Sequence, residues 1–300
     1  MFATRGLNVP VLPTRGATVF SDLNAGSLGR LRSVHAGSDM ALMRFAAGDD
    51  PGPSFGELLR RIGVAPFVHA TEPVTIPLPH ATTCVAIRCA NGVVIAGDRR
   101  ATSGALISHR EMDKVLPADR FSAVAIAGAA GPAMEMIKLF QLQIEHYEKI
   151  EGTALSLEGK ANQLSSFVRS NLPAAMQGML VVPIFAGFDR ETNVGRIWDF
   201  DATGGRYEER DYVATGSGSL HAGAVVRMGW RSGLAIDDGV GLACRALWEA
   251  SEADSATGGP DLVRGVFPIV ARINDAGFER VTDDHLRLVF ERIIEEVGSR

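Results

Sequence analysis

The segment HATTCVAIRCANGVVIAGDRR, residues 80–100, decides the fold of the chain that follows it. Side chains alternate in character over residues 83–89 with a period of two, which is typical of a half-buried strand. Asn91-Gly92 predicts a type I′ hairpin turn, and the apolar residues 93–96 predict the return strand. Because the return strand leads directly into Asp98, we expect a carboxylate close to the start of the first strand.

Composition excludes several classes of protein. The 300 residues are 46% apolar, which allows a packed core of full size. The net charge of −5 is mild, and no basic stripe is interleaved with aromatic residues, which argues against nucleic-acid binding. No apolar run approaches the ~20 residues that span a bilayer, and the first thirty residues lack the apolar centre of a signal peptide. A cytoplasmic location is therefore expected.

Cysteine and histidine usage gives no sign of a disulfide framework or a metal site. Cys84, Cys89 and Cys244 leave an odd thiol in any pairing scheme, which predicts buried reduced thiols. The seven histidines are scattered without metal-ligand spacing, and no dinucleotide fingerprint is present. No metal or other cofactor is implied.

Residues 1–81 differ in amino-acid composition from the rest of the chain. They carry many prolines, glycines and serines and only short helical patterns, a composition that resists a packed core of its own. The pattern itself is compatible with a flexible tail or with a segment that is removed.

Beyond the first hairpin, the periodicity predicts an α+β protein with helices outside stacked sheets. Asp237 is expected to cap the helix that it begins. The expected helices are 132–150, 157–172, 219–228, 237–253 and 283–297, and the expected strands are 121–127, 179–187, 196–200, 206–209, 212–215, 265–273 and 278–281.

An ordered set of short motifs resembles the β-subunits of 20S proteasomes, specifically the actinobacterial type. The resemblance covers nearly everything from His80 onward, and its pieces are Thr82-Thr83, Gly97-Asp98-Arg99-Arg100-Ala101-Thr102, Lys114, Ala127-Gly128, Gly216-Ser217-Gly218-Ser219-Leu220 and residues 254–261, DSATGGPD. It implies the four-layer αββα sandwich of N-terminal nucleophile hydrolases over residues 82–300. It also implies that residues 1–81 are a propeptide, cleaved between Ala81 and Thr82.

The resemblance assigns roles to individual residues. Thr82 would supply the nucleophilic hydroxyl and, after cleavage, an α-amino group that acts as base. Lys114 would lie beside that amine and be held by Asp98, and the Gly128 N–H would donate to the oxyanion. Ser217, Asp254 and Thr257 would orient the amine and a water, with Thr257 standing where many family members have serine. Taken singly, each of these residues is ordinary: a strand threonine, turn and surface charges, glycine-rich turns and a helix C-terminus.

Substrate contacts follow from the same resemblance. Counting from the nucleophile places Ala101, Met112, Ile126, Ala130 and Met134 around the residue before the cut, and these apolar side chains predict cleavage after large hydrophobic residues. Thr102 would bind the extended peptide through its backbone, as a strand added to an edge.

One position departs from the family pattern. Ala81 stands where a glycine usually precedes the threonine, and alanine resists backbone conformations that glycine accepts. Self-processing is therefore expected to be slower or to depend on assembly.

The partners that the resemblance implies are other β-subunits in a heptameric ring, capping α-subunits, an ATP-dependent unfoldase, and protein substrates tagged with a small ubiquitin-like protein. Two other interpretations remain. One is a structural β-type subunit that assembles without processing because of Ala81, and the other is a small-molecule amidase of the same nucleophile class. Retention of the whole polar set argues against the first, and the continuous motifs argue against the second.

Overall fold

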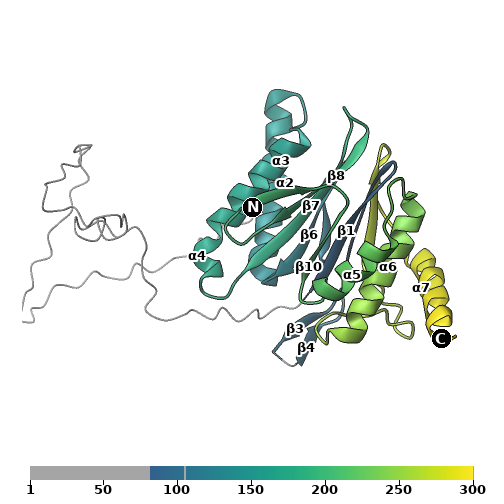
Figure 1. Ribbon diagram of the computed structural model, residues 1–300. Helices are drawn as coiled ribbons and strands as arrows, with labels where there is room; N and C mark the ends of the chain where they lie inside the picture. Colours follow the sequence, from purple (N-terminus) through teal and green to yellow (C-terminus); the bar gives the residue numbers. More distant parts are fainter. Residues whose placement is uncertain (1–81, 105, 300) are drawn as a thin grey trace, which may run out of the picture. The chain divides into compact units, whose positions relative to one another are not determined.

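The computed structural model describes residues 82–104 and 106–299, and in these ranges two stacked sheets lie between two layers of helices (Figure 1). The first sheet is antiparallel with the order β10-β1-β2-β11-β12, and the hairpin of β1 and β2 lies near its centre. Its strands are β1 (Thr83–Cys89), β2 (Gly92–Gly97), β10 (Tyr212–Gly216), β11 (Ile269–Asn274) and β12 (Gly277–Arg280). The proposed propeptide, residues 1–81, lies outside the described residues.

The second sheet is also antiparallel and has the order β5-β6-β7-β8-β9. Its strands are β5 (Val115–Asp119), β6 (Ser122–Gly128), β7 (Val181–Asp189), β8 (Val194–Phe200) and β9 (Arg206–Glu209). A separate short hairpin, β3 (Ala101–Ser103) and β4 (Leu106–His109), joins the first sheet to the second along the chain.

Helices cover the outer face of each sheet. The second sheet carries α2 (Ala130–Glu151) and α3 (Leu157–Ser170), followed by the short α4 (Leu172–Ala175). The first sheet carries α5 (Ser219–Gly229), α6 (Ile236–Ala253) and α7 (Asp283–Gly298). No helix within the described ranges is long and apolar enough to cross a membrane.

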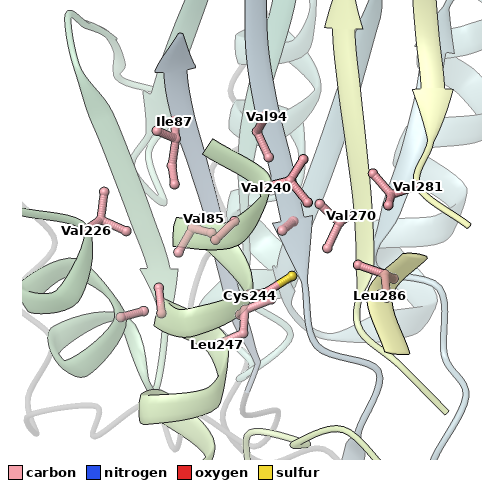
Figure 2. Close-up of a cluster of buried hydrophobic side chains, with 14 of the residues drawn as sticks. Val85, Ile87, Val94, Val226, Val240, Cys244, Leu247, Val270, Val281 and Leu286 are labelled. Carbon is pink, nitrogen blue, oxygen red and sulfur yellow. The ribbon is translucent and has the colours of Figure 1, made fainter. Parts of the chain in front are cut away.

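Three apolar clusters correspond to the three interfaces between the four layers. On β1, Val85 and Ile87 face the helices and belong to one cluster with residues of α6, and Figure 2 shows Val85 near Cys244 and Leu247. The alternate residues of β1 face the second sheet and pack in the cluster between the sheets. A third cluster fills the space between the second sheet and its helices. The strand period of two thus puts both faces of β1 in apolar surroundings, and the expected αββα sandwich is confirmed.

The hairpin is present, but its turn lies one residue earlier than the sequence predicts. Cys89 pairs with Gly92, so Ala90-Asn91 form the turn. The predicted type I′ turn is wrong, because it requires a positive φ at both central residues and Asn193 is the one non-glycine residue in the described ranges with that geometry. Gly92 instead lies on the return strand with φ 152°, close against the backbone of Ile273.

The other predicted elements are confirmed with small shifts. α6 begins at Ile236 with Ala235 as its N-cap, so Asp237 lies in the first turn and does not cap the helix. The strand predicted over residues 265–273 begins only at Ile269, because the preceding residues form turns closed by an Asp261–Val266 bridge. The cysteines are free and buried, as expected, and burial raises the pKa of each thiol to about 12.

Candidate active site

Thr82 lies directly before β1 and lines a small cavity at the end of the two sheets. The cavity collects residues from β6, α2, the start of β1 and the segment between β2 and β5. Its lining residues are Thr82, Arg100, Ala101, Met112, Lys114, Ile126, Gly128 and Ala130. Three predicted catalytic residues, Thr82, Lys114 and Gly128, therefore share one cavity although 46 positions separate the first from the last.

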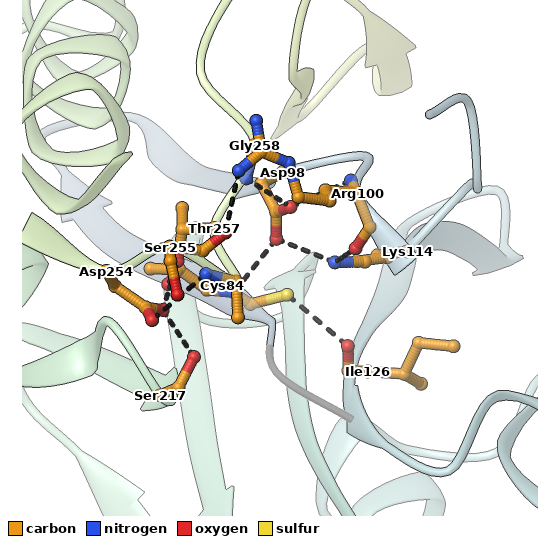
Figure 3. A network of polar contacts seen from close by, with 12 residues as sticks. Cys84, Asp98, Arg100, Lys114, Ile126, Ser217, Asp254, Ser255, Thr257 and Gly258 are labelled. Atoms are coloured by element: carbon orange, nitrogen blue, oxygen red, sulfur yellow. Dashed lines mark hydrogen bonds and ion pairs between the residues drawn. The ribbon is translucent and has the colours of Figure 1, made fainter. Parts of the chain in front are cut away.

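A buried ion pair lies beside this cavity. Lys114 Nζ is 2.8 Å from Asp98 Oδ1, and the two side chains are 2% and 0% exposed (Figure 3). Lys114 Nζ also donates to the carbonyl oxygen of Arg100 at 2.5 Å. A buried ammonium needs a counter-charge and hydrogen-bond acceptors, and this one has both. Its position is consequently fixed from two sides.

Asp98 is held by main-chain donors from three parts of the chain. Oδ1 accepts from the Thr83 N–H at 2.9 Å, and Oδ2 accepts from the Arg100 N–H at 2.8 Å and the Gly258 N–H at 2.9 Å. Together with Lys114 these bonds occupy both oxygens of the carboxylate. Asp98 therefore ties the start of β1 to the loop after α6 as well as orienting the lysine.

A second polar cluster surrounds Asp254, at the C-terminus of α6. The Ser217 hydroxyl and the Thr257 hydroxyl both donate to Asp254 Oδ2, the latter at 2.6 Å (Figure 3). Partial burial would raise the pKa of Asp254, but these two bonds, the Ala256 N–H and the nearby His221 outweigh burial and hold that pKa below its usual value. Asp254 is therefore an ionised acceptor at neutral pH.

The two clusters meet at Thr83. The Thr83 hydroxyl oxygen lies 2.5 Å from the Thr257 hydroxyl oxygen, and the Thr83 main-chain N–H donates to Asp98 Oδ1. Gly218 makes this approach possible, because a methyl group at Gly218 would overlap the Thr83 hydroxyl. The sequence analysis named Thr83 within the Thr82-Thr83 motif but assigned it no role, and the signal available was a second hydroxyl residue inside a strand whose neighbours are apolar.

Gly128 ends β6 with φ 112°, a conformation that side chains rarely adopt, and a methyl group there would overlap the carbonyl oxygen of Leu180. Earlier on β6, the Ile126 N–H donates to the Lys114 carbonyl oxygen, and just after the strand the Ala129 N–H donates to the Leu180 carbonyl oxygen. Since successive N–H groups of a strand point to opposite sides, the Gly128 N–H points to the same side as that of Ile126, toward Lys114. The backbone conformation and the nearby Leu180 carbonyl thus require glycine here, and the N–H of that glycine points to the Lys114 side.

Four of the five residues predicted to surround the substrate side chain before the cut line the cavity. Ala101, Met112, Ile126 and Ala130 line the cavity, whereas Met134 is not among its lining residues and packs against the cluster under α2. Two further residues, which belong to the quoted motifs but were assigned no role, contribute to the site: Arg100 lines the cavity and Gly258 donates to Asp98.

Thr102 is buried on β3 and pairs with Ile107 of β4. Its role as an edge for an added strand stays a prediction. Within residues 82–104 and 106–299, no group of three or more histidine, cysteine or acidic side chains is arranged to hold a metal ion.

Known proteins of similar sequence point to a single family. The family model for the proteasome subunit matches residues 78–263. Over 268 residues the chain is 52% identical to a proteasome subunit beta of Acidimicrobium ferrooxidans, and the match covers 88% of this chain and 98% of that protein. Over 225 residues it is 53% identical to a proteasome subunit beta of Streptomyces griseus subsp. griseus, covering 74% of this chain and 80% of the relative.

Proposed function

The chain belongs to the proteasome subunit family and is a β subunit, and from this premise we propose that it is a threonine endopeptidase whose nucleophile is Thr82. As a β subunit it is a protease of the proteasome family and assembles into proteasome particles with other subunits. The observation that carries the proposal is the buried Asp98–Lys114 pair, which lies beside a cavity lined by Thr82 and Gly128.

In the proposed reaction, Thr82 supplies both nucleophile and base. Its hydroxyl attacks the scissile carbonyl, and the α-amino group freed by maturation accepts the hydroxyl proton. A terminal amine has an ordinary pKa of about 7.7–8.0, so a large share of it is neutral near pH 7.5 and able to take a proton. The ammonium of Lys114 disfavours protonation of this amine, and Asp98 keeps Lys114 in place.

Charge that develops on the scissile oxygen needs a fixed donor. The Gly128 N–H is the proposed one, and the support is its direction toward the Lys114 side of β6. Ser217, Asp254 and Thr257 are proposed to orient the amine and the attacking water, since Asp254 collects both hydroxyls into one cluster.

Maturation is proposed to use the same Thr82 hydroxyl at a stage when the Thr82 nitrogen is still part of the peptide bond and cannot act as base; the hydroxyl proton ends on that nitrogen as the bond breaks. The Thr82 hydroxyl attacks the carbonyl carbon of Ala81, the bond between Ala81 and the Thr82 nitrogen breaks, and the resulting ester is hydrolysed by water. This releases residues 1–81 as a propeptide and leaves residues 82–300 as the catalytic domain. Because alanine at position 81 resists the tight bend that the attack requires, we expect processing to depend on assembly or to be slow.

Specificity is proposed to favour large hydrophobic residues before the cut. Four apolar side chains, Ala101, Met112, Ile126 and Ala130, line the cavity next to Thr82. An extended substrate would add as a strand beside Thr102.

We also propose the setting in which the subunit works. It would form heptameric rings with other β-subunits, capped by α-subunits, in the cytoplasm. An ATP-dependent unfoldase would feed in substrates that carry a ubiquitin-like tag. Confinement in such a chamber would keep an unselective nucleophile away from folded proteins.

The test is co-expression with an α-subunit, isolation of the particle, and N-terminal mass spectrometry of the β chain together with a fluorogenic peptide assay. A peptide with leucine or phenylalanine before the cut is compared with one that has aspartate. The proposal expects a new N-terminus at Thr82, hydrolysis of the hydrophobic peptide, and no activity in Thr82→Ala. An assembled particle with an intact Met1 end and no activity would refute it and favour a catalytically silent ring subunit.

A further inference from the structure

The Thr83 hydroxyl is buried next to the polar site but takes no part in the proposed reaction steps. Thr83 and Thr257 are both 0% exposed, and their hydroxyl oxygens are 2.5 Å apart. Along β1, residues of the same parity as Thr83, such as Val85, face the helices, whereas Cys84 faces the second sheet. Thr83 therefore points away from the second sheet, and any effect of its hydroxyl must pass through Thr257.

Counting protons fixes the direction of this contact. Asp254 is an ionised carboxylate and can only accept, so the Thr257 hydroxyl, 2.6 Å away, donates its single proton to Asp254. Toward Thr83, Thr257 then has only lone pairs to offer, and Thr83 must be the donor. The result is a directed chain from Thr83 through Thr257 to Asp254.

We propose that Thr83 is a positioning residue of the hydrolytic site, whose hydroxyl fixes the Thr257 hydroxyl in the orientation that serves Asp254. The proposal rests on the proposed function, because it assigns Thr83 a part in the same reaction. A polarised chain strengthens each of its bonds, so loss of the first donor weakens the hold on the last acceptor. The main-chain N–H of Thr83 serves Asp98 and would be retained in any substitution.

The test compares isosteric variants in assembled particles, with each rate divided by the fraction of β chain that starts at Thr82. Thr83→Val keeps the shape and removes the hydroxyl, and Thr83→Ser keeps the hydroxyl and removes a methyl group. We expect Thr83→Val to lower kcat by about 3- to 10-fold, the effect of one neutral hydrogen bond, with KM unchanged. Thr83→Ser should retain at least half of the parent rate. Thr215→Val is the matched control, because Thr215 is a buried threonine opposite Cys84 on the adjacent strand β10.

A double-mutant cycle separates positioning from general damage. If Thr83 acts through Thr257, the double variant with Thr257→Val should be no slower than Thr257→Val by itself. The inference would be overturned if the rate losses of Thr83→Val and Thr257→Val multiplied in the double variant. Equal rate losses in Thr83→Val and Thr83→Ser, or a Thr83→Val particle as fast as the parent, would also overturn it. If too little of the Thr83→Val chain matures, Thr83→Ala replaces it in the comparison. The inference then expects a lower kcat for Thr83→Ala than for Thr83→Ser.

The same series separates the role of Thr83 from the proposed function itself. Parent particles whose activity disappears in Thr82→Ala uphold the proposed function, whatever the result for Thr83. A Thr83→Val particle as fast as the parent would then refute only the inference about Thr83. Mature, assembled parent particles without activity would refute both.

Discussion

Replacing Asp98 by asparagine removes a charge and half of the hydrogen-bond acceptors from the centre of the site. An asparagine amide has one acceptor oxygen and one NH2 group in place of two carboxylate oxygens. One oxygen of Asp98 faces Thr83 N–H and Lys114, and the other faces the N–H groups of Arg100 and Gly258. In either orientation of the amide, its NH2 group therefore meets two donors.

The expected loss of stability follows from these contacts. Removing one partner of a buried ion pair costs about 3–5 kcal/mol, because the other charge stays buried without compensation. Each main-chain N–H that loses its acceptor in a buried site costs about 1–3 kcal/mol. With the amide oxygen turned toward Lys114, the low ends of these ranges together give a loss of about 5 kcal/mol in the free energy of unfolding for Asp98→Asn.

Asp113→Asn is the matched control, because Asp113 lies next to Lys114 and pairs with Arg99 at 3.1 Å but is 47% exposed. An exposed pair of this kind contributes about 0–1 kcal/mol, so the control should remain close to the parent. All variants carry Thr82→Ala, which keeps differences in processing out of the measurement. Urea unfolding of the full chain, followed by the fluorescence of buried Trp198 and by circular dichroism, gives the free energies.

A further substitution tests the cause. Adding Lys114→Met to Asp98→Asn removes the uncompensated charge, so the double variant should be more stable than the sum of the two single losses predicts. A loss below about 1 kcal/mol for Asp98→Asn, or strict additivity in the double variant, would refute the assignment of Asp98 and Lys114 as a mutually dependent buried pair.

Three further outcomes are expected. Gly128→Ala should lower the melting temperature, because its methyl group would overlap Leu180 O, and should reduce peptide hydrolysis by about 100-fold or more, because the strained backbone would move the proposed oxyanion N–H out of position. Gly131→Ala, with nothing within 4 Å of its new methyl group, should leave both unchanged. Met112→Ala should raise the ratio of kcat/KM for large over small residues before the cut by about 10-fold, and Met134→Ala should not alter that ratio. Asp254 has a folded-state pKa below its unfolded value of about 3.9, so its contribution to stability is present above that pH and is lost as the pH falls through the folded value. Urea unfolding from pH 2.5 to 6 should show a smaller rise in stability for Asp254→Asn than for the parent, and equal slopes would contradict the assignment.

The strand period and the short motifs were enough to predict the layers of the fold. The alternation over residues 83–89 predicted a strand buried on one face, and β1 is buried on both faces, because helices cover one side and a second sheet covers the other. The short strands β3, β4 and β5 were not predicted, since three to five residues with mixed exposure carry too little periodicity to detect. The turn at Ala90-Asn91 was displaced because the backbone of Ile273 approaches Gly92, a tertiary contact that local turn preferences do not contain.

The site was predictable to the extent that its residues belong to recognisable motifs. Lys114 and Asp98 were expected to pair, and they lie 2.8 Å apart. The contact of Thr83 with the site was not predicted, although Thr83 belongs to a quoted motif, because a hydroxyl in a strand has no distinctive sequence signature until the residue it meets is known. Met134 was placed in the pocket by counting from the nucleophile, but it does not line the cavity. It packs instead beside the buried cluster under α2, because the packing of that helix decides which side chains reach the pocket.

The polar site is closed by contacts that are remote in sequence. Thr83 and Thr257 are 174 residues apart, and the bond from Gly258 to Asp98 spans 160 residues. A nascent chain leaving the ribosome exposes Thr82 long before Gly258 has been synthesised, and during that interval the carboxylate that holds Lys114 lacks one of its donors. The full set of contacts around Asp98 and Thr83 forms only when the segment after α6 is in place. A translation product truncated before residue 254 would therefore carry Thr82, the proposed nucleophile, without the Asp254 cluster and without the Gly258 donor to Asp98.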